Sequence, residues 1–488
     1  MRQGPLANSY PGAVTLVVCS LVPYLVLTVA VFPLSEIISM DLGMSRPALL
    51  VTVSLSAGAY AVGTLLAAQF ALHLPPRRML IGYEVCFFAA SVLAAAAPNA
   101  TVFIGAYIAQ GLLTSLMLIA ALPPLVTSWP ARKMPISAGI LNLCIFGAVS
   151  VGPTVGALQA AAHGWRWLFW GVAVVAGLAL LFAVLTFRDT PAQDPGAPWD
   201  FVALALGITG CGAAFYGAGQ LQASMTADVQ SVVPLAAGAA LIAFLVAYEY
   251  RLPNPLVPVK ALATSVPLAG ILAALTTSAA AFGAMELLLA VLRTASTPTT
   301  TALVFLPEFV AAIAVAALFA VLFRTRFTPL LPAAGLLMVV AAVALLMVTV
   351  PAVDPALAAA TGLIGLGVAA AVSPALFLAG LSLRSKQLQR VFALIELLRA
   401  VTAFLTAPIL VFLAGTLGDN QIAGTRDALW ICLAIAVVGL VGATALYLSG
   451  RPRLETPDLE RWQSRGEPAW TSPPLLSALP RRRQRQGR

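Results

Sequence analysis

The stretch GAVSVGPTVG, residues 147–156, lies inside a long apolar run and contains three glycines and one proline. Both residue types weaken an isolated helix, so their concentration here needs an explanation from packing. Steps of four residues along the run give a slanting stripe of small side chains, namely Cys144, Ala148, Gly152, Gly156 and Ala160. In a membrane such a stripe lets a second helix approach closely. Pro153 removes the backbone hydrogen bond to the Val149 carbonyl and favours a bend.

The composition of the whole chain is that of an integral membrane protein. It is 60% hydrophobic and 9% charged over 488 residues, whereas soluble domains are roughly 45–50% apolar and 25% charged. The five cysteines lack metal-ligand spacing, the two histidines are far apart, and no Gly-rich loop precedes a Lys-Ser/Thr pair. We therefore expect no metal site, no cofactor and no ATPase. We also expect no enzyme, because no set of nucleophile, base and orienting group is visible.

Apolar segments of about 20 residues, the length that crosses a bilayer, occur fourteen times. They cover roughly 12–34, 48–72, 79–97, 101–123, 136–162, 167–187, 201–221, 230–250, 264–291, 299–323, 329–350, 355–383, 388–416 and 427–449. The sequence thus predicts an all-α membrane protein whose termini lie on one side, with breaks at Pro75-Pro76, Pro98-Asn99, Pro329 and Pro351.

The distribution of positive charge indicates which side that is. If the N-terminus is inside, one face receives thirteen Lys and Arg residues from the loops and nine Arg residues from the tail at 451–488. The other face receives only Arg46, Arg166, Arg293 and Arg426. Because Lys and Arg prefer short cytoplasmic loops, we expect both termini in the cytoplasm. This topology accounts for the net charge of +9, so we expect no nucleic-acid partner, and the basic tail is suited to contact anionic lipid.

A polar linker, RDTPAQDPGAPWD at 188–200, divides six helices from the rest. The predicted organisation is a six-helix bundle at 1–189, a linker with an inserted two-helix hairpin at 190–262, a second six-helix bundle at 263–450 and a cytoplasmic basic tail at 451–488. Two six-helix halves are the layout of a secondary transporter.

Several motifs carry a family resemblance. Gly147, Gly152, Pro153 and Gly156 match an antiporter motif, a glycine followed by Gly-Pro-x-x-Gly, on the fifth helix. Further similar stretches are GWRWLF at 164–169, TPTTTALVFLP at 297–307, EYRLPNPLVP at 249–258 and IAQGL at 108–112. On these motifs the chain resembles the major facilitator superfamily, specifically its fourteen-helix drug:proton antiporters. The resemblance implies two six-helix bundles with an inserted hairpin.

Other family positions differ. The loop between helices two and three keeps only Arg77 and Arg78 of its motif, with Leu72 in place of the acid. Tyr107 stands where the family has an arginine on helix four, and Tyr24 where it has an acid on helix one. Two usual contributors to proton coupling are therefore missing.

Ionisable residues within the membrane are candidates for that coupling, because burying a charge there costs about 2.5–3.5 kcal/mol on the most lenient scale. Glu286 and Glu308 could each take a proton from one side and release it to the other. The alternative is a carboxyl satisfied by nearby hydroxyls. Glu396 and Arg399, three residues apart, could instead form a structural tie. Glu84 and Glu249 lie near helix ends, where we expect them to reach toward water.

Small and polar residues predict the substrate pathway. Helix four places Tyr107, Gln110, Gly111 and Thr114 on one face, and helix one does the same with Ser20, Tyr24 and Thr28. The resemblance implies that both helices line a central cavity. The alternative is that these groups only bond neighbouring helices.

The sequence therefore predicts a proton-driven exporter of small hydrophobic or amphiphilic compounds, monomeric, in a bacterial inner membrane. Its partners would be the solute, protons and the lipid bilayer. An importer or facilitator, and a transport-inactive sensor or scaffold, remain alternatives. Whether a periplasmic adaptor protein extends the route through a second membrane is also open.

Overall fold

The computed structural model describes residues 3–186, 188, 191–192, 194–450 and 455–473. Of the predicted basic tail, 451–454 and 474–488 lie outside these described residues. Within them, fourteen helical segments are long and apolar enough to cross a membrane, which confirms the predicted count.

The spans follow one another along the chain with short connections. They are α1 (Tyr10–Asp41), α2 (Arg46–His73), α3 (Pro76–Ala95), α4 (Ala100–Thr127), the joined helices α5 (Met134–Asn142), η2 (Leu143–Gly147) and α6 (Ala148–Ala161), α7 (Trp165–Leu185), α8 (Phe201–Ser224), α9 (Val229–Arg251), α10 (Ser265–Ala295), α11 (Pro298–Leu322), α12 (Leu331–Thr349), α13 (Pro355–Leu381), α14 (Leu388–Leu417) and α15 (Gln421–Ser449). A short helix, α16 (Leu459–Arg465), follows the last span.

Local sequence explains where these helices begin. Each predicted break lies where one membrane-spanning helix ends and the next begins, with Pro76 as the first residue of α3 and Pro329 inside a short 3₁₀ helix, η4 (Thr328–Leu330). Asn99 caps α4 by accepting a hydrogen bond from the Val102 amide at 3.0 Å, and Asp354 caps α13 in the same way through the Leu357 amide. Asn and Asp satisfy amides that the first helical turn leaves without partners. α1 extends to Asp41, seven residues beyond its predicted end at 34.

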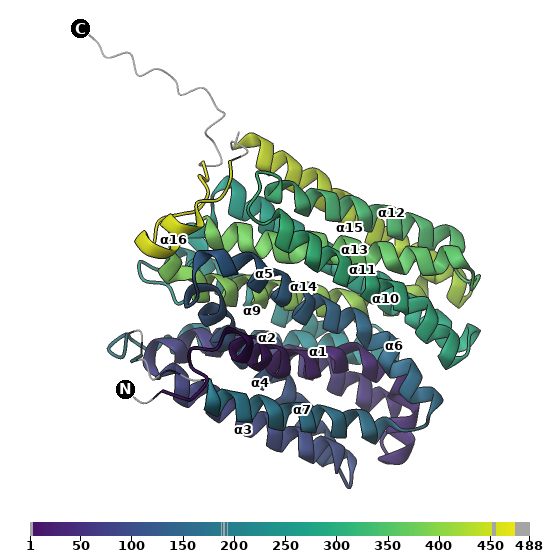
Figure 1. Ribbon diagram of the computed structural model, residues 1–488. Coiled ribbons are helices and arrows are strands. Elements are labelled where there is room, and N and C mark those ends of the chain that lie inside the picture. The colour runs from purple at the N-terminus through teal and green to yellow at the C-terminus, as the bar shows by residue number, and fades with distance from the viewer. Residues whose placement is uncertain (1–2, 187, 189–190, 193, 451–454, 474–488) are drawn as a thin grey trace.

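The helices form two groups that lie one above the other in Figure 1. In the first, α1 to α7, the closest packing joins α2 with α4, α1 with α6 and α3 with α7. In the second, α10 to α15, it joins α12 with α13, α10 with α15 and α11 with α13. We call these groups the N half and the C half.

Two seams join the halves: α2 packs on α14, and the α5–α6 segment packs on α11. The hairpin helix α8 packs on its partner α9 and also on α2 and α14, so it contacts both halves. We call the end of the bundle that carries residues 3–9 and 455–473 the terminal end, and the other the distal end.

The stretch 147–156 begins at the end of a π-helical turn, η2, and continues as α6 through Pro153. Gly152 and Gly156 face α1, whereas Gly147 lies against Leu143 of η2 and Phe309 of α11. A Cβ added to Gly152 would lie 2.8 Å from the Val26 carbonyl oxygen, and one added to Gly156 would overlap the Ala30 carbonyl. The two glycines therefore permit a backbone contact between α1 and α6 that any larger residue would prevent.

The segment 455–473, which includes α16, lies across the terminal end (Figure 1). Trp462 is fully buried and donates its indole N–H to the Leu383 carbonyl of the C half at 3.0 Å. Its neighbour Gln463 donates to two carbonyls of the N half, Thr127 at 2.8 Å and Trp129 at 2.6 Å. We call residues 455–473 the C-terminal strap, because it ties the two halves together.

Candidate transport cavity

A cavity of about 410 Å³ opens at the distal end between the halves. Its wall is built by the distal ends of α1, α2, α6, α8, α10, α11, α14 and α15. Most of the wall is apolar, from residues such as Phe32, Leu50, Leu287 and Val411. A largely apolar pocket with a few polar groups is the usual form of a binding site for a small molecule.

Glu286 of α10 is the one carboxylate in the described wall of this cavity. Its side chain is 8% exposed. Gln222 of α8 lies beside it, with Nε2 3.5 Å from Glu286 Oε2, a long and weak contact. The inserted hairpin thus contributes to the cavity, which the sequence analysis did not predict. In the sequence, the only sign that α8 reaches the cavity is that Gln222 is a polar residue near the end of an apolar helix.

A cluster of aromatic rings lies beside the cavity, and we call it the aromatic floor. Four of its rings, from Tyr24, Tyr107, Phe282 and Phe404, border a small space that shares Phe32, Gln222 and Glu286 with the cavity wall. Phe282 and Phe404 of the C half lie with ring centroids 5.1 Å apart, and Phe404 contacts Tyr60 of the N half at 6.3 Å. Tyr60 stacks on Tyr24 at 6.2 Å, and Tyr24 contacts Tyr107 at 6.0 Å. This aromatic floor spans both halves.

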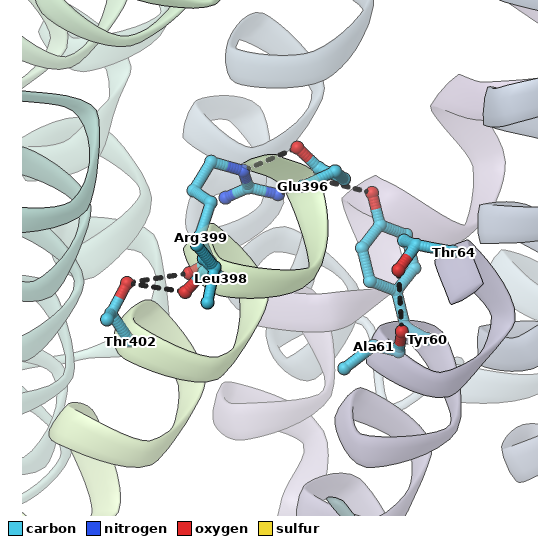
Figure 2. Close-up of polar contacts among 7 residues, drawn as sticks. All are labelled: Tyr60, Ala61, Thr64, Glu396, Leu398, Arg399 and Thr402. Carbon is cyan, nitrogen blue, oxygen red and sulfur yellow. Dashed lines mark hydrogen bonds and ion pairs between the residues drawn. The ribbon is translucent and has the colours of Figure 1, made fainter. Parts of the chain in front are cut away.

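Below this floor, Glu396 and Arg399 of α14 form an ion pair within the membrane, as the i,i+3 spacing predicted (Figure 2). They are 3% and 2% exposed. The Tyr60 hydroxyl donates to Glu396 Oε1 at 2.7 Å, and the Arg399 guanidinium lies 5.7 Å from the Phe146 ring. Both partners come from the N half. A buried pair needs such additional contacts because desolvation otherwise outweighs the attraction between the charges.

Glu308 of α11 lies in the second seam. It is 3% exposed, and Ser150 of α6 hydrogen-bonds to it across the halves. Its other oxygen, Oε2, has no partner among the described residues. Nearby, the Thr154 hydroxyl donates to the Ala302 carbonyl at 3.1 Å. Each seam therefore contains a carboxylate of the C half bonded to a hydroxyl of the N half.

The structure separates the seven residues predicted to line the pathway. Tyr24, Thr28 and Tyr107 line a small space at the aromatic floor, together with Glu286. The other four lie in contacts inside the N half: Ser20 with Glu84, Gln110 with Ser91, Gly111 against Ser56 and Thr114 with the Gln110 carbonyl. Ser20 and Gln110 match the alternative in which polar groups bond neighbouring helices, whereas Thr114 bonds within its own helix and Gly111 permits close packing.

The expectation that Glu84 and Glu249 reach toward water is wrong. Both side chains are fully buried. Glu84 accepts a hydrogen bond from Ser20, and Glu249 accepts one from the Val257 amide at 3.1 Å. Local packing against α1 and against the loop after α9 covers them, which their distance from the helix ends could not reveal.

The remaining candidates lie at the terminal end. Arg77 and Arg78 occupy the first turn of α3, with Arg77 half-buried and Arg78 exposed. No group of three or more His, Cys, Asp or Glu side chains among the described residues is placed to hold a metal ion. Residues that the sequence did not single out are Tyr60, Ser150, Gln222, Phe282 and Phe404. Tyr60, Ser150 and Gln222 contact predicted residues from other helices, and Phe282 and Phe404 line the small space beside Glu286.

Two packed helical halves around an apolar cavity define a multi-pass membrane transporter. The family model of the Major Facilitator Superfamily matches residues 16–351. The chain belongs to this superfamily.

Relatives in sequence are distant. The multidrug resistance protein B homolog of Mycobacterium tuberculosis is 31% identical over 188 residues, which are 38% of this chain and 34% of the relative. The lincomycin resistance protein LmrB of Bacillus subtilis is 27% identical over 125 residues, 26% of either chain. The matched region thus spans about a third or less of these relatives' own length.

Solved structures extend the likeness of fold to nearly the whole chain. The human organic anion transporter MFSD10 (TETRAN) aligns with a TM-score of 0.61 and 14% identity, over 89% of this chain and 99% of that one. A peptide transporter named POT aligns with a TM-score of 0.59 and 16% identity, over 90% and 95% of the two chains. These likenesses concern the fold alone.

Proposed function

We propose that this protein exports small hydrophobic or amphiphilic molecules in exchange for protons, with the two halves rocking to open the cavity to each side of the membrane in turn. The terminal end would face the cytoplasm of a bacterial inner membrane, because Lys and Arg of the loops concentrate there. The cavity would then open to the outside.

The observation that carries this proposal is the position of Glu286. It is the one carboxylate in the described wall of an otherwise largely apolar cavity. A carboxylate in such surroundings can bind either a proton or a cationic part of a solute, but not both. Competition of this kind links solute release to proton uptake.

The two seams supply a second support. Glu308 and Glu396 each bond a hydroxyl of the opposite half. A change in the protonation of either carboxyl would alter a bond between the halves, and rocking must break or remake these bonds. The names of the sequence relatives, a multidrug resistance protein homolog and a lincomycin resistance protein, agree with export of drug-like compounds.

The test is transport in inverted membrane vesicles with an imposed proton gradient. The solutes are a panel of cationic, zwitterionic and neutral fluorescent dyes. We expect gradient-dependent accumulation with wild type, and loss of it with Glu286→Gln and Glu308→Gln. Glu84→Gln is the matched control, because Glu84 is equally buried but lies in the N half away from the cavity and both seams.

The outcomes separate the alternatives. Gradient-dependent depletion instead of accumulation would indicate an importer. Flux that does not respond to the gradient would indicate a facilitator. No flux of any dye would favour a sensor or scaffold. Wild-type flux in both glutamine variants would show that Glu286 and Glu308 do not couple transport to protons. The proposal of export would still stand.

A further inference from the structure

Four arginines lie at the distal end, and the structure gives them two different surroundings. Arg166 pairs with Asp41 at 2.9 Å and donates to the Ala95 and Ala97 carbonyls. Arg426 donates to the Val350 carbonyl at 2.8 Å. These two tie loops to helices.

The other two arginines, Arg46 and Arg293, line the mouth of the cavity. Both are exposed, and neither makes a hydrogen bond or an ion pair with the described residues. Glu36 lies on the same rim and acts on Arg46 electrostatically. The rim thus carries two positive charges and one negative charge, with both guanidinium groups available to a ligand.

The arrangement along α10 relates the rim to Glu286. Glu286 and Arg293 are seven residues apart, so they lie on the same face of the helix, separated by about 10 Å along its axis. Leu289 and Ala290 lie between them in the cavity wall. The cavity therefore presents an acid at its inner end, an apolar surface of about 10 Å and a positive rim at its mouth.

We propose that this cavity selects amphiphiles with a charge at each end: a protonated amine or amidinium facing Glu286, and a carboxylate or similar anionic group facing Arg293 and Arg46. Arginine suits this role because its planar guanidinium donates two parallel hydrogen bonds to a carboxylate. Arg293 is then a specificity-determining residue. The inference rests on the proposed function insofar as the cavity is the substrate site.

The probes are two dyes that differ only in the anionic group. Rhodamine B is zwitterionic, whereas its ethyl ester keeps the delocalised cation and lacks the carboxylate. Binding to the purified full-length protein is measured by fluorescence anisotropy at two salt concentrations, for wild type, Arg293→Gln, Arg46→Gln and Glu286→Gln. Arg324→Gln is the matched control, because Arg324 is an exposed arginine at the terminal end and lies outside the cavity wall.

We expect Arg293→Gln to weaken binding of the zwitterion by about fivefold, the value of one good exposed charge pair. Binding of the ester should stay within about twofold of wild type on the same scale. Arg46→Gln should act in the same direction. Glu286→Gln should weaken both dyes, because both keep the cation, and Arg324→Gln should change neither. High salt should reduce the effect of Arg293→Gln.

Equal changes for both dyes in Arg293→Gln, no change in either, or no binding of either dye to wild type would each overturn the inference. Its failure is separate from that of the proposed function. Binding with the expected selectivity but without gradient-dependent transport in vesicles would contradict export and leave the selectivity of the cavity standing.

Discussion

The hydroxyl of Tyr60 and the carboxylate of Glu396 meet 2.7 Å apart from opposite halves of the protein. This bond lies between the aromatic floor of the cavity and the terminal end, and Arg399 holds the carboxylate from its other side (Figure 2). If the halves rock, the terminal end opens only when this bond breaks. The bond is therefore expected to stabilise the conformation in which the cavity opens at the distal end.

Tyr60→Phe removes this bond and keeps the ring that packs on Tyr24 and Phe404. We expect the distal-open conformation to lose about 1 kcal/mol, a roughly fivefold shift in population. The measurement is labelling of Ser373→Cys, which lines a small space beside Glu396 on the terminal side, by a membrane-impermeant maleimide in a background without native cysteines. Labelling from the terminal end should accelerate in Tyr60→Phe. An unchanged rate would mean that this bond does not hold the seam.

Glu396→Gln leaves the Arg399 guanidinium without its counter-charge in a fully buried position. Removing one partner of a buried ion pair costs about 3–5 kcal/mol, so we expect a marked fall in the unfolding temperature in detergent. Replacing both, as Glu396→Gln with Arg399→Met, removes the unpaired charge and should recover most of that loss. Equal destabilisation in the single and double variants would show that the pair contributes through packing and not through charge.

The ion pair between Glu396 and Arg399 could be predicted from the sequence. The hydrogen bond that Tyr60 adds to it could not. Glu396 and Arg399 are one turn apart on one helix, so their contact is local. Tyr60 lies 336 residues away from Glu396, and only the packing of α2 on α14 brings it there. The same reason hides Gln222 beside Glu286. The fourteen spans were predictable because length and apolarity alone decide whether a helix can cross a bilayer.

The three residues predicted to share one face of helix one lie in two different environments. Tyr24 and Thr28 reach the aromatic floor, whereas Ser20, one turn away, bonds Glu84 on α3. Helical periodicity gives the face of a helix but not the depth at which the cavity ends. That depth depends on rings from four other helices, which no pattern in α1 reports.

The C-terminal strap should also stabilise the distal-open conformation, because it joins the two halves at the terminal end. Gln463→Ala removes both hydrogen bonds to the N half, at Thr127 and Trp129, and leaves Trp462 docked on the C half. We expect faster maleimide labelling of Ser373→Cys from the terminal end, as in Tyr60→Phe. The matched control is Ser464→Ala, because among the described residues the Ser464 hydroxyl bonds only to the Glu460 carbonyl within α16. If both variants label at the wild-type rate, the strap packs on the bundle without restraining it.

The contact between α1 and α6 can be tested with a pair of glycines. Gly156 lies against the Ala30 carbonyl, so a leucine there must push the two helices apart, whereas Gly171 on α7 has no heavy atom within 4 Å of its added Cβ. Overpacking of a tight contact costs about 1–3 kcal/mol, and we expect Gly156→Leu to lower the unfolding temperature and abolish dye transport. Gly171→Leu should fold and transport as wild type does, because the new side chain meets open space. A Gly156→Leu protein with wild-type stability and flux would mean that α1 and α6 can separate at no cost, and the glycines of 147–156 would then need an explanation other than close packing.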